Sequence, residues 1–271
     1  MAKTLYVSDL DGTLLRGDQQ LSQFTIDTLR ELVARGMIFS YATARSLITA
    51  SQATAGLTLN IPVIIYNGSF VVESATGKHL LSNAFTAAES TCILDTILGQ
   101  GVYPIVYSFI EGAEKFSYCH QHESRGTKIF NDTRRGDIRD NPVDDAKDLY
   151  LGEVFHITCI DEPERLLPLY EAFKDRYPCV YHRDIYSGEQ WLEIQPLGAT
   201  KAQAILALKD LLGCDRLVCF GDGKNDISMF EIADECYAVQ NADEALKCMA
   251  TATIESNECD GVVRWLAEHY C

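Results

Sequence analysis

The sequence lacks an uninterrupted apolar run of about 20 residues, the length that a membrane-spanning helix needs. Its first ten residues, MAKTLYVSDL, also lack the basic region, apolar run and small-residue cleavage site of a secretory signal. The ten cysteines form no C-x-x-C pair and have no partner histidines at zinc-ligand spacing. We therefore expect a cytoplasmic protein without membrane contacts, whose cysteines are reduced and mostly buried.

Positive charge is also scarce, because 23 Lys and Arg face 39 Asp and Glu and leave a formal net charge of −16. General nucleic-acid binding relies on basic side chains that neutralise phosphates, so the composition argues against it. A small anionic substrate held by a few local cations stays compatible with this charge. The expected partner is a small molecule, and the chain is expected to be a monomer or a small homo-oligomer.

The 271 residues, 47 % of them apolar, suffice for one large or two moderate domains. Short apolar segments alternate with helical patterns in the first part of the chain. The helix over 21–36 should begin at a Ser22 cap, stop at Gly36 and bury one apolar face. That face comprises Phe24, Ile26, Leu29, Leu32 and Val33. Strands are expected at 4–8, 37–43 and 61–66, and a second helix at 44–57. Such alternation predicts a parallel α/β sheet.

The pattern changes after Gly68 and returns after residue 197. The middle part predicts a hairpin, several strands, two helices and a charged, exposed loop. These are the hairpin at 69–82, strands at 103–109 and 153–161, two strands within 179–196 about Ser187-Gly188, helices at 87–101 and 164–177, and the loop or turn at 131–148. We predict an α/β fold with a Rossmann-like parallel-sheet core, formed by residues 1–83 and 191–271. An inserted α/β cap domain, residues 84–190, would interrupt it.

The segment DLDGTLL, residues 9–15, places two carboxylates two residues apart where the first strand ends. Two like charges at such a short distance need a cation, a shared proton or open solvent. Ligands of parallel sheets bind at the carboxyl ends of the strands, where several other polar residues are expected. These residues are Thr43, Asn67, Asp222 and Asp226 at strand ends, and Lys201 at a helix start. Such a group of carboxylates suits a hard divalent cation such as Mg²⁺.

Each motif alone has an ordinary alternative. A D-x-D-G segment is often only a turn, Thr43 could be a plain strand-end residue, and Lys201 could be a solvated helix residue. A calcium loop is excluded, because Leu14 and Gln20 stand where that loop requires Gly and Glu. The segment GDGKND at 221–226 lacks the spacing of a phosphate-binding P-loop. The conjunction of the motifs, in this order, is what favours a functional site.

That conjunction resembles the haloacid-dehalogenase-like superfamily, and its Cof-type branch in particular. The matching segments are DLDGT at 9–13, YATAR at 41–45, EIQPLGATK at 193–201 and GDGKND at 221–226. The Asn67-Gly68 step and the segments AVQNADEALK and SNECDGVVRWL near the end also look like that branch. The resemblance covers essentially the whole chain, with Ala44 standing where many relatives have Gly.

The resemblance implies a role for each motif residue. Asp9 would be the nucleophile that forms an aspartyl-phosphate, and Asp11 would be the general acid and base. Mg²⁺ would be held by Asp9, Asp222 and the backbone carbonyl of Asp11, with Asp226 in support. The phosphate-binding group would be Gly12, Thr13, Thr43, Lys201 and Asn225.

The resemblance also implies the activity, a Mg²⁺-dependent phosphatase of small phosphorylated metabolites, mainly sugar phosphates. A phosphomutase of sugar phosphates and a non-catalytic phosphate- or metal-binding module on the same fold are the alternatives. Substrate choice would lie with the cap, where a single polar residue is more often structural or solvent-facing than specific. Candidates are His156, His182, Arg183 and Glu189 from the insert, with Arg45 and Asn67 from the core. The large Lys224 either points to solvent, as Lys usually does, or reaches toward an anionic substrate.

Overall fold

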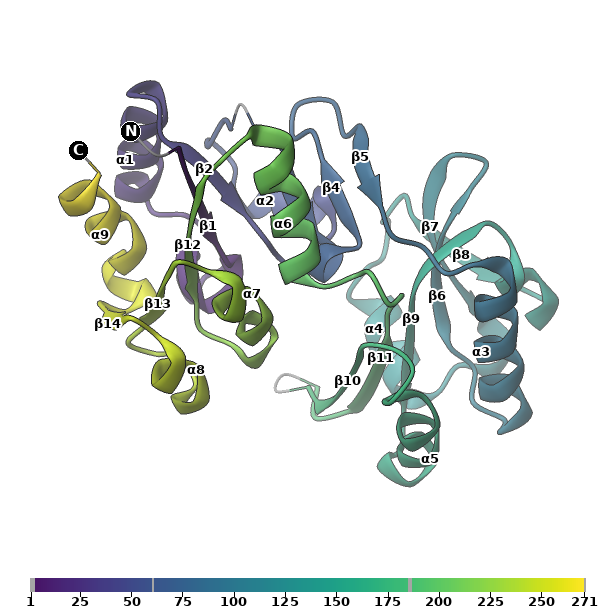
Figure 1. Ribbon diagram of the computed structural model, residues 1–271. Coiled ribbons are helices and arrows are strands. Elements are labelled where there is room, and N and C mark those ends of the chain that lie inside the picture. Colours follow the sequence, from purple (N-terminus) through teal and green to yellow (C-terminus); the bar gives the residue numbers. More distant parts are fainter. Residues whose placement is uncertain (1–2, 60, 185–186, 271) are drawn as a thin grey trace. The chain divides into compact units, whose positions relative to one another are not determined.

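The computed structural model describes residues 3–59, 61–184 and 187–270. It divides into two compact units (Figure 1). The first unit combines Met1–Ser82 with Gly198–Cys271, and the second is Asn83–Leu197. The predicted boundaries lay after residues 83 and 190. That the second unit is a cap domain stays a prediction.

A five-stranded sheet forms the centre of the first unit, in the order β14-β13-β12-β1-β2, and all its strand pairs are parallel. Its strands are β1 (Thr4–Ser8), β2 (Ile38–Tyr41), β12 (Arg216–Gly221), β13 (Glu235–Val239) and β14 (Ala252–Ile254). The predicted α/β fold with a parallel core sheet is thereby confirmed. Strand β14 had no counterpart among the predicted elements.

A second sheet of three strands, β3-β4-β5, continues beyond β2. Its strands are β3 (Val63–Ile65), β4 (Phe70–Val72) and β5 (His79–Ser82). A single parallel bridge between Ala42 and Ile64 joins it to the end of β2. The end of β3 therefore lies beside the end of β2, and the predicted hairpin after Gly68 is present as β4 and β5.

Helices cover the sheets of the first unit (Figure 1). They are α1 (Gln23–Ala34), α2 (Leu47–Ala53), α6 (Lys201–Leu212), α7 (Ile227–Ile232), α8 (Glu244–Met249) and α9 (Gly261–His269). Helix α1 begins as predicted, because the Ser22 hydroxyl accepts the Thr25 N–H. The predicted burial of Phe24 is wrong, since this side chain is 46 % exposed. The Arg264 guanidinium lies 5.2 Å from the centre of the Phe24 ring, so the ring contacts a surface cation and not the apolar core.

The second unit contains a six-stranded sheet in the order β10-β11-β9-β6-β7-β8, antiparallel except for the parallel pair β7 and β8. Its strands are β6 (Ile105–Ile110), β7 (Ala113–Cys119), β8 (Asp140–Val143), β9 (Glu153–Asp161), β10 (Cys179–Arg183) and β11 (Gln190–Ile194). Its helices are α3 (Ala87–Gly99), α4 (Arg125–Asp132) and α5 (Pro163–Phe173). Apolar residues of α3 and α5, such as Leu94 and Leu166, pack with Ile157 and Leu192 of the sheet in one core.

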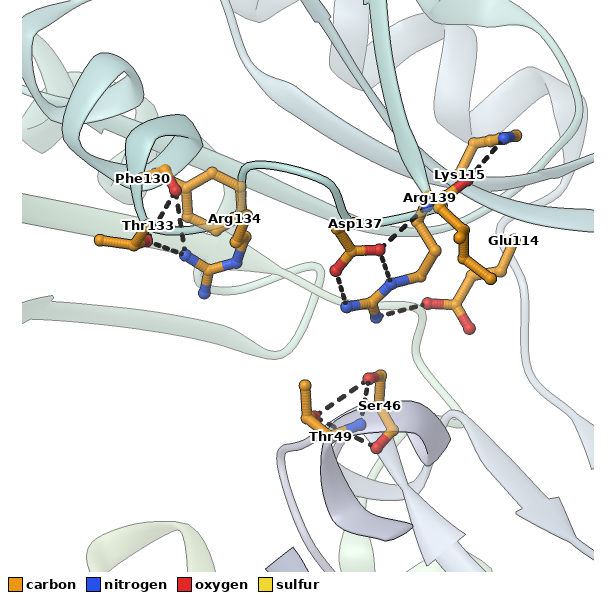
Figure 2. A network of polar contacts seen from close by, with 10 residues as sticks. Ser46, Thr49, Glu114, Lys115, Phe130, Thr133, Arg134, Asp137 and Arg139 are labelled. Carbon is orange, nitrogen blue, oxygen red and sulfur yellow. Dashed lines mark hydrogen bonds and ion pairs between the residues drawn. The ribbon is translucent and has the colours of Figure 1, made fainter. Parts of the chain in front are cut away.

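The segment 131–148, predicted as an exposed loop or turn, is mostly exposed, but it also contributes β8 and contains a buried cation that was not predicted. Figure 2 shows that Arg139 binds two carboxylates at once. Its side chain, 6 % exposed, donates to Asp137 at 2.9 and 2.6 Å and to Glu114 at 2.9 Å. The Arg139 fork also holds the pKa of Asp137 below its ordinary value. Paired charges can be buried, so the high charge density of this segment did not exclude the burial of Arg139.

Within the described part of the chain, no helix is long and apolar enough to cross a membrane. The nine cysteines of this part are all unpaired. Five of them are buried, namely Cys119, Cys159, Cys214, Cys219 and Cys236.

Candidate active site

Three adjacent parallel strands of the first unit end in polar residues at one edge of the sheet. Asp9 follows β1, Thr43 follows β2 and Asp222 follows β12, and these strands are neighbours in the order β12-β1-β2. The Asp9 N–H donates to the Phe220 carbonyl of β12 at 2.9 Å, so the sheet pairing continues to the first site residue. This edge, where parallel sheets bind their ligands, is where the structure collects the predicted carboxylates.

Lys201 is the first residue of α6 and lies almost completely buried, with 1 % of its surface exposed. Its ammonium group contacts Asp9 Oδ1 at 2.5 Å and Asp226 Oδ1 at 2.7 Å. Burial alone would lower the pKa of Lys201, but Asp226 and Asp9 raise it above the ordinary value. Lys201 is therefore a charged member of the acidic cluster and not a solvated helix residue.

Asp226 is fully buried, and donors satisfy both of its carboxylate oxygens. Oδ1 accepts from Lys201, and Oδ2 accepts the backbone N–H groups of Asp222 and Gly223, each at 3.0 Å. A carboxylate with this many donors is tied to the protein. Asp226 thus holds the GDGKND loop and Lys201 in place, while its support of a metal ion stays a prediction.

Asp9 and Asp222 each keep one carboxylate oxygen available. Asp9 uses Oδ1 for Lys201, and Asp222 uses Oδ1 to accept the Thr13 hydroxyl at 2.9 Å. No hydrogen-bond donor of the described residues contacts the second oxygen of either side chain. Ligand atoms of Asp9, Asp222 and Asp226 lie within 4.8 Å of one another. The site therefore offers oxygen ligands at metal-binding spacing.

The charge of this cluster is unbalanced, since three carboxylates share one ammonium group. Burial raises the pKa of Asp9 well above its usual range, against the opposing attraction of Lys201. Burial, followed by the neighbouring Asp226 charge, raises the pKa of Asp222 to about 6. The surplus negative charge and the two available oxygens fit a hard divalent cation, whose ligands are carboxylate and carbonyl oxygens.

Asp11 is half-exposed and forms an ion pair with Arg45. The Arg45 guanidinium binds both of its carboxylate oxygens, at 2.8 and 2.5 Å. It also donates to the Gln19 side-chain oxygen at 2.9 Å. This two-pronged ion pair holds the Asp11 side chain in one orientation. Arg45, predicted as a substrate-side residue, therefore contacts the proposed general acid and base within the protein.

Gly12 allows the DLDGTLL turn to approach the GDGKND loop closely. Its φ of +77° lies in the left-handed region. A Cβ atom added at this position would lie 2.4 Å from Asp222 Oδ2. Glycine is thus required here for two reasons. The left-handed backbone conformation disfavours other residues, and a Cβ atom would collide with the Asp222 carboxylate.

The turn Tyr66–Gly68 after β3 connects the Thr43 and Lys201 segments. The Asn67 N–H donates to the Thr43 carbonyl at 2.9 Å, and Thr43 itself is fully buried. A Cβ at Gly68 would lie 2.2 Å from the Thr200 carbonyl oxygen, directly before Lys201. Tyr66, Asn67 and Gly68 all have positive φ values, so the turn keeps a costly conformation beside the site.

Other predicted residues are less closely connected with the cluster. Asn225 and Lys224 are exposed, and Lys224 reaches Asp243 at 3.9 Å. The Asn67 side-chain oxygen is buried without a hydrogen-bond partner in the described structure. In the second unit, His156 contacts Glu193 at 3.7 Å, and Glu189 contacts Arg125 at 3.3 Å.

Two residues that bind the DLDGTLL turn received no predicted role. Asn241 donates to the Gly12 carbonyl at 2.7 Å, and Asn257 donates to the Leu15 carbonyl at 2.9 Å. Both lie in the C-terminal segments AVQNADEALK and SNECDGVVRWL, which carried part of the family resemblance. That resemblance was the only signal in the sequence that could have pointed to them.

Comparisons with known proteins match this chain over nearly its whole length. A family model described as haloacid dehalogenase-like hydrolase matches residues 6–266. Two Bacillus subtilis proteins, the 5-amino-6-(5-phospho-D-ribitylamino)uracil phosphatases YitU and YwtE, are 27% and 25% identical to it. The match to YitU covers 98% of this chain and 97% of YitU. The match to YwtE covers 95% of this chain and 95% of YwtE. A crystal structure of a Thermotoga maritima protein, 24% identical, has a TM-score of 0.80 and covers 100% of this chain and 98% of that one.

Proposed function

The chain belongs to the haloacid dehalogenase-like hydrolase family as a phosphatase of the Cof type, and from this premise we propose that Asp9 attacks the phosphorus of a small phosphorylated metabolite with Mg²⁺ as cofactor. The observation that carries the proposal is the arrangement around Lys201. Its ammonium group binds Asp9 Oδ1 and leaves the second oxygen of this carboxylate without a donor in the described structure. A buried carboxylate with one fixed and one available oxygen is suited to act as a nucleophile.

The reaction would proceed in two steps. The available Asp9 oxygen forms a bond to phosphorus while the bond to the leaving alcohol oxygen breaks, and Asp11 donates a proton to that oxygen. Water then attacks the aspartyl-phosphate, Asp11 accepts its proton, and inorganic phosphate leaves with Asp9 restored. The Arg45 ion pair holds the Asp11 side chain in one orientation, and Asp11 must release one of these contacts to carry the proton that it donates.

Phosphoryl transfer depends on positioning and on neutralisation of charge. Mg²⁺ would be held by Asp222, the backbone carbonyl of Asp11 and the Asp9 oxygen that also accepts from Lys201, because a carboxylate oxygen can bind more than one partner. The other Asp9 oxygen then stays available for phosphorus, and the metal would neutralise the charge of the phosphoryl oxygens and of the carboxylates. Lys201 supplies a fixed positive charge from the protein, and Asp226 keeps it in place. Thr43 and the N–H groups of Gly12 and Thr13 would bind the phosphoryl oxygens.

The substrate class we propose is a phosphorylated sugar or polyol. The two named Bacillus relatives act on a phosphorylated ribityl group, a polyhydroxy chain that ends in a phosphate monoester. This supports a polyhydroxylated leaving group here as well. Identities of 27% and 25% leave the identity of the sugar or polyol to experiment.

The direct test is phosphate release from a substrate panel. The panel would contain sugar phosphates, polyol phosphates, 5-amino-6-(5-phospho-D-ribitylamino)uracil, nucleotides and p-nitrophenyl phosphate, each with Mg²⁺ and with EDTA. We expect Mg²⁺-dependent release, fastest from a sugar or polyol phosphate and abolished by EDTA. Conversion of one sugar phosphate into an isomer without phosphate release would instead support a mutase. A chain that binds phosphate but turns over none of the panel would be a non-catalytic module.

Mg²⁺ should stabilise the protein more at pH 8 than at pH 5. The pKa of Asp222 in the folded state is about 6, above its ordinary value of 3.8, so folding favours its protonated form. In EDTA this contribution to the free energy of unfolding is present below about pH 4 and is lost as the pH rises to about 6, by at most about 3 kcal/mol. Above pH 6 the ionised carboxylate is free to bind the metal, which restores stability.

This effect can be measured as the change in Tm on replacing EDTA with saturating Mg²⁺ at both pH values. The matched control is Asp222→Asn, which keeps the shape of the side chain but removes its charge and titration. Its increase in Tm with Mg²⁺ should be smaller than that of the unmodified protein, and should differ less between pH 5 and pH 8, because only Asp9 then couples metal binding to pH. An equal increase at both pH values for the unmodified protein would show that Asp222 does not couple metal binding to pH.

A further inference from the structure

Three side chains from the C-terminal part of the chain bind the loop that follows β1. Asn241 donates to the Gly12 carbonyl at 2.7 Å, and Asn257 donates to the Leu15 carbonyl at 2.9 Å. Asp260 binds the next residue, Arg16, through two contacts at 3.1 and 2.6 Å. The loop that carries Asp11 is thus held at three successive points by residues more than 200 positions away.

The orientation of the Asn241 amide follows from its two partners. Its Nδ2 lies against the Gly12 carbonyl, which can only accept, and its Oδ1 accepts the Asn257 N–H at 3.2 Å, which can only donate. A flipped amide would place donor against donor and acceptor against acceptor. The hydrogen bond from Asn257 therefore fixes the orientation of the Asn241 amide, with its N–H group directed at the Gly12 carbonyl.

Fixing the Gly12 carbonyl also fixes the N–H of the next residue. The Gly12–Thr13 peptide is trans and planar, so its C=O and N–H point in opposite directions. The Thr13 N–H therefore points away from Asn241. The Asp222 side chain restricts the movement of this loop, because it lies against Gly12 and accepts the Thr13 hydroxyl at 2.9 Å.

We propose that Asn241 is a positioning residue that aims the Thr13 N–H at the phosphoryl group, an inference that rests on the proposed phosphatase function. Because the Thr13 hydroxyl stays bound to Asp222, loss of Asn241 frees the peptide plane to rotate without releasing the loop. The effect should therefore appear in catalysis and not in folding. An N–H donor aimed at developing charge contributes mainly in the transition state.

Two variants test this role. Asn241→Asp keeps the acceptor for Asn257 but replaces the donor to Gly12 with a negatively charged oxygen, while Asn241→Ala removes both groups without adding charge and is therefore the decisive variant for phosphate and vanadate binding. Asn241 is exposed, so water can replace the lost partners and both variants should fold. For each we expect kcat to fall about 10- to 100-fold and KM to change less than about threefold. The matched control is Gln23→Ala, an exposed amide on α1 that binds only Asp27 within its helix.

A second readout separates positioning from a general structural role. Orthovanadate adopts a five-coordinate geometry like that of the transferring phosphoryl group, so its inhibition constant should rise by the same factor as kcat falls. The affinity for inorganic phosphate and the Tm should stay close to those of the Gln23→Ala control. Unchanged kcat in both variants of an active enzyme, or a fall in kcat without weaker vanadate inhibition, would overturn the inference. Absence of turnover in the unmodified protein would overturn the proposed function itself.

Discussion

Replacing Asp9 with Asn is expected to lower the rate of phosphate release by at least about 10⁴-fold, because the amide cannot attack phosphorus as a carboxylate does. The variant keeps the size of the side chain and an oxygen that can accept from Lys201. No other side chain of the cluster can replace the nucleophile, since donors occupy both oxygens of Asp226 and Asp222 lies at the end of a different strand. The loss should therefore be of catalysis alone.

The stability of Asp9→Asn should equal or exceed that of the unmodified protein in EDTA. Burial raises the pKa of Asp9 well above its usual range, so its ionised form is disfavoured in the folded state. A neutral isostere removes this penalty, and Lys201 keeps its ion pair with Asp226. Two measurements check the result, the steady-state rate on the best substrate of the panel and the Tm at pH 8.

The matched control for Asp9→Asn is Asp27→Asn. Asp27→Asn makes the same chemical change on the exposed surface of α1 and should retain full activity. Borohydride reduces an acyl-phosphate to an alcohol, so treatment of the substrate-loaded enzyme should convert Asp9 to homoserine in the unmodified protein and in Asp27→Asn, and should give no homoserine in Asp9→Asn. More than about one per cent residual activity in Asp9→Asn would mean that another group attacks phosphorus.

The site residues nearest to Asp9 could be predicted because local sequence patterns place them. Alternating strands and helices predict a parallel sheet, and a parallel sheet brings the ends of its strands to one edge. Asp9, Thr43 and Asp222 follow from this rule, and Lys201 follows from the helix start after the segment EIQPLGATK. The rule places residues on an edge. It says nothing about which carboxylate oxygens are occupied.

The hydrogen bonds of Asn241 and Asn257 could not be predicted in this way. They join side chains to backbone carbonyls across 229 and 242 residues, and no local periodicity relates the partners. The burial of Arg139 within the otherwise mostly exposed segment 131–148 was missed for a different reason. The charges of this segment were interpreted as solvent-exposed, whereas Arg139 is buried because Asp137 and Glu114 neutralise it.

Lys201→Met should abolish phosphate release and also destabilise the fold, unlike Asp9→Asn. Methionine has a similar length and fits an apolar environment, but it leaves Asp9 and Asp226 buried without their shared cation. Removing one partner of a buried ion pair typically costs about 3–5 kcal/mol, because the remaining charge is uncompensated. We expect a loss of stability of this size at pH 8, measured by chemical denaturation in EDTA.

The destabilisation of Lys201→Met should be smaller at pH 5 than at pH 8. Without the ammonium group, the folded-state pKa of Asp9 rises further above that of the unfolded chain, so protonation favours the folded variant. The matched control is Lys209→Met on the same helix, whose 3.9 Å contact with Asp234 is more exposed and should contribute little. Adding Asp226→Asn to Lys201→Met removes one uncompensated charge, and should recover stability without recovering activity. An unchanged free energy of unfolding for Lys201→Met at both pH values would mean that something other than Lys201 balances the buried charges. The assignment of this cluster as a nucleophile, a cation and a metal site would then be wrong.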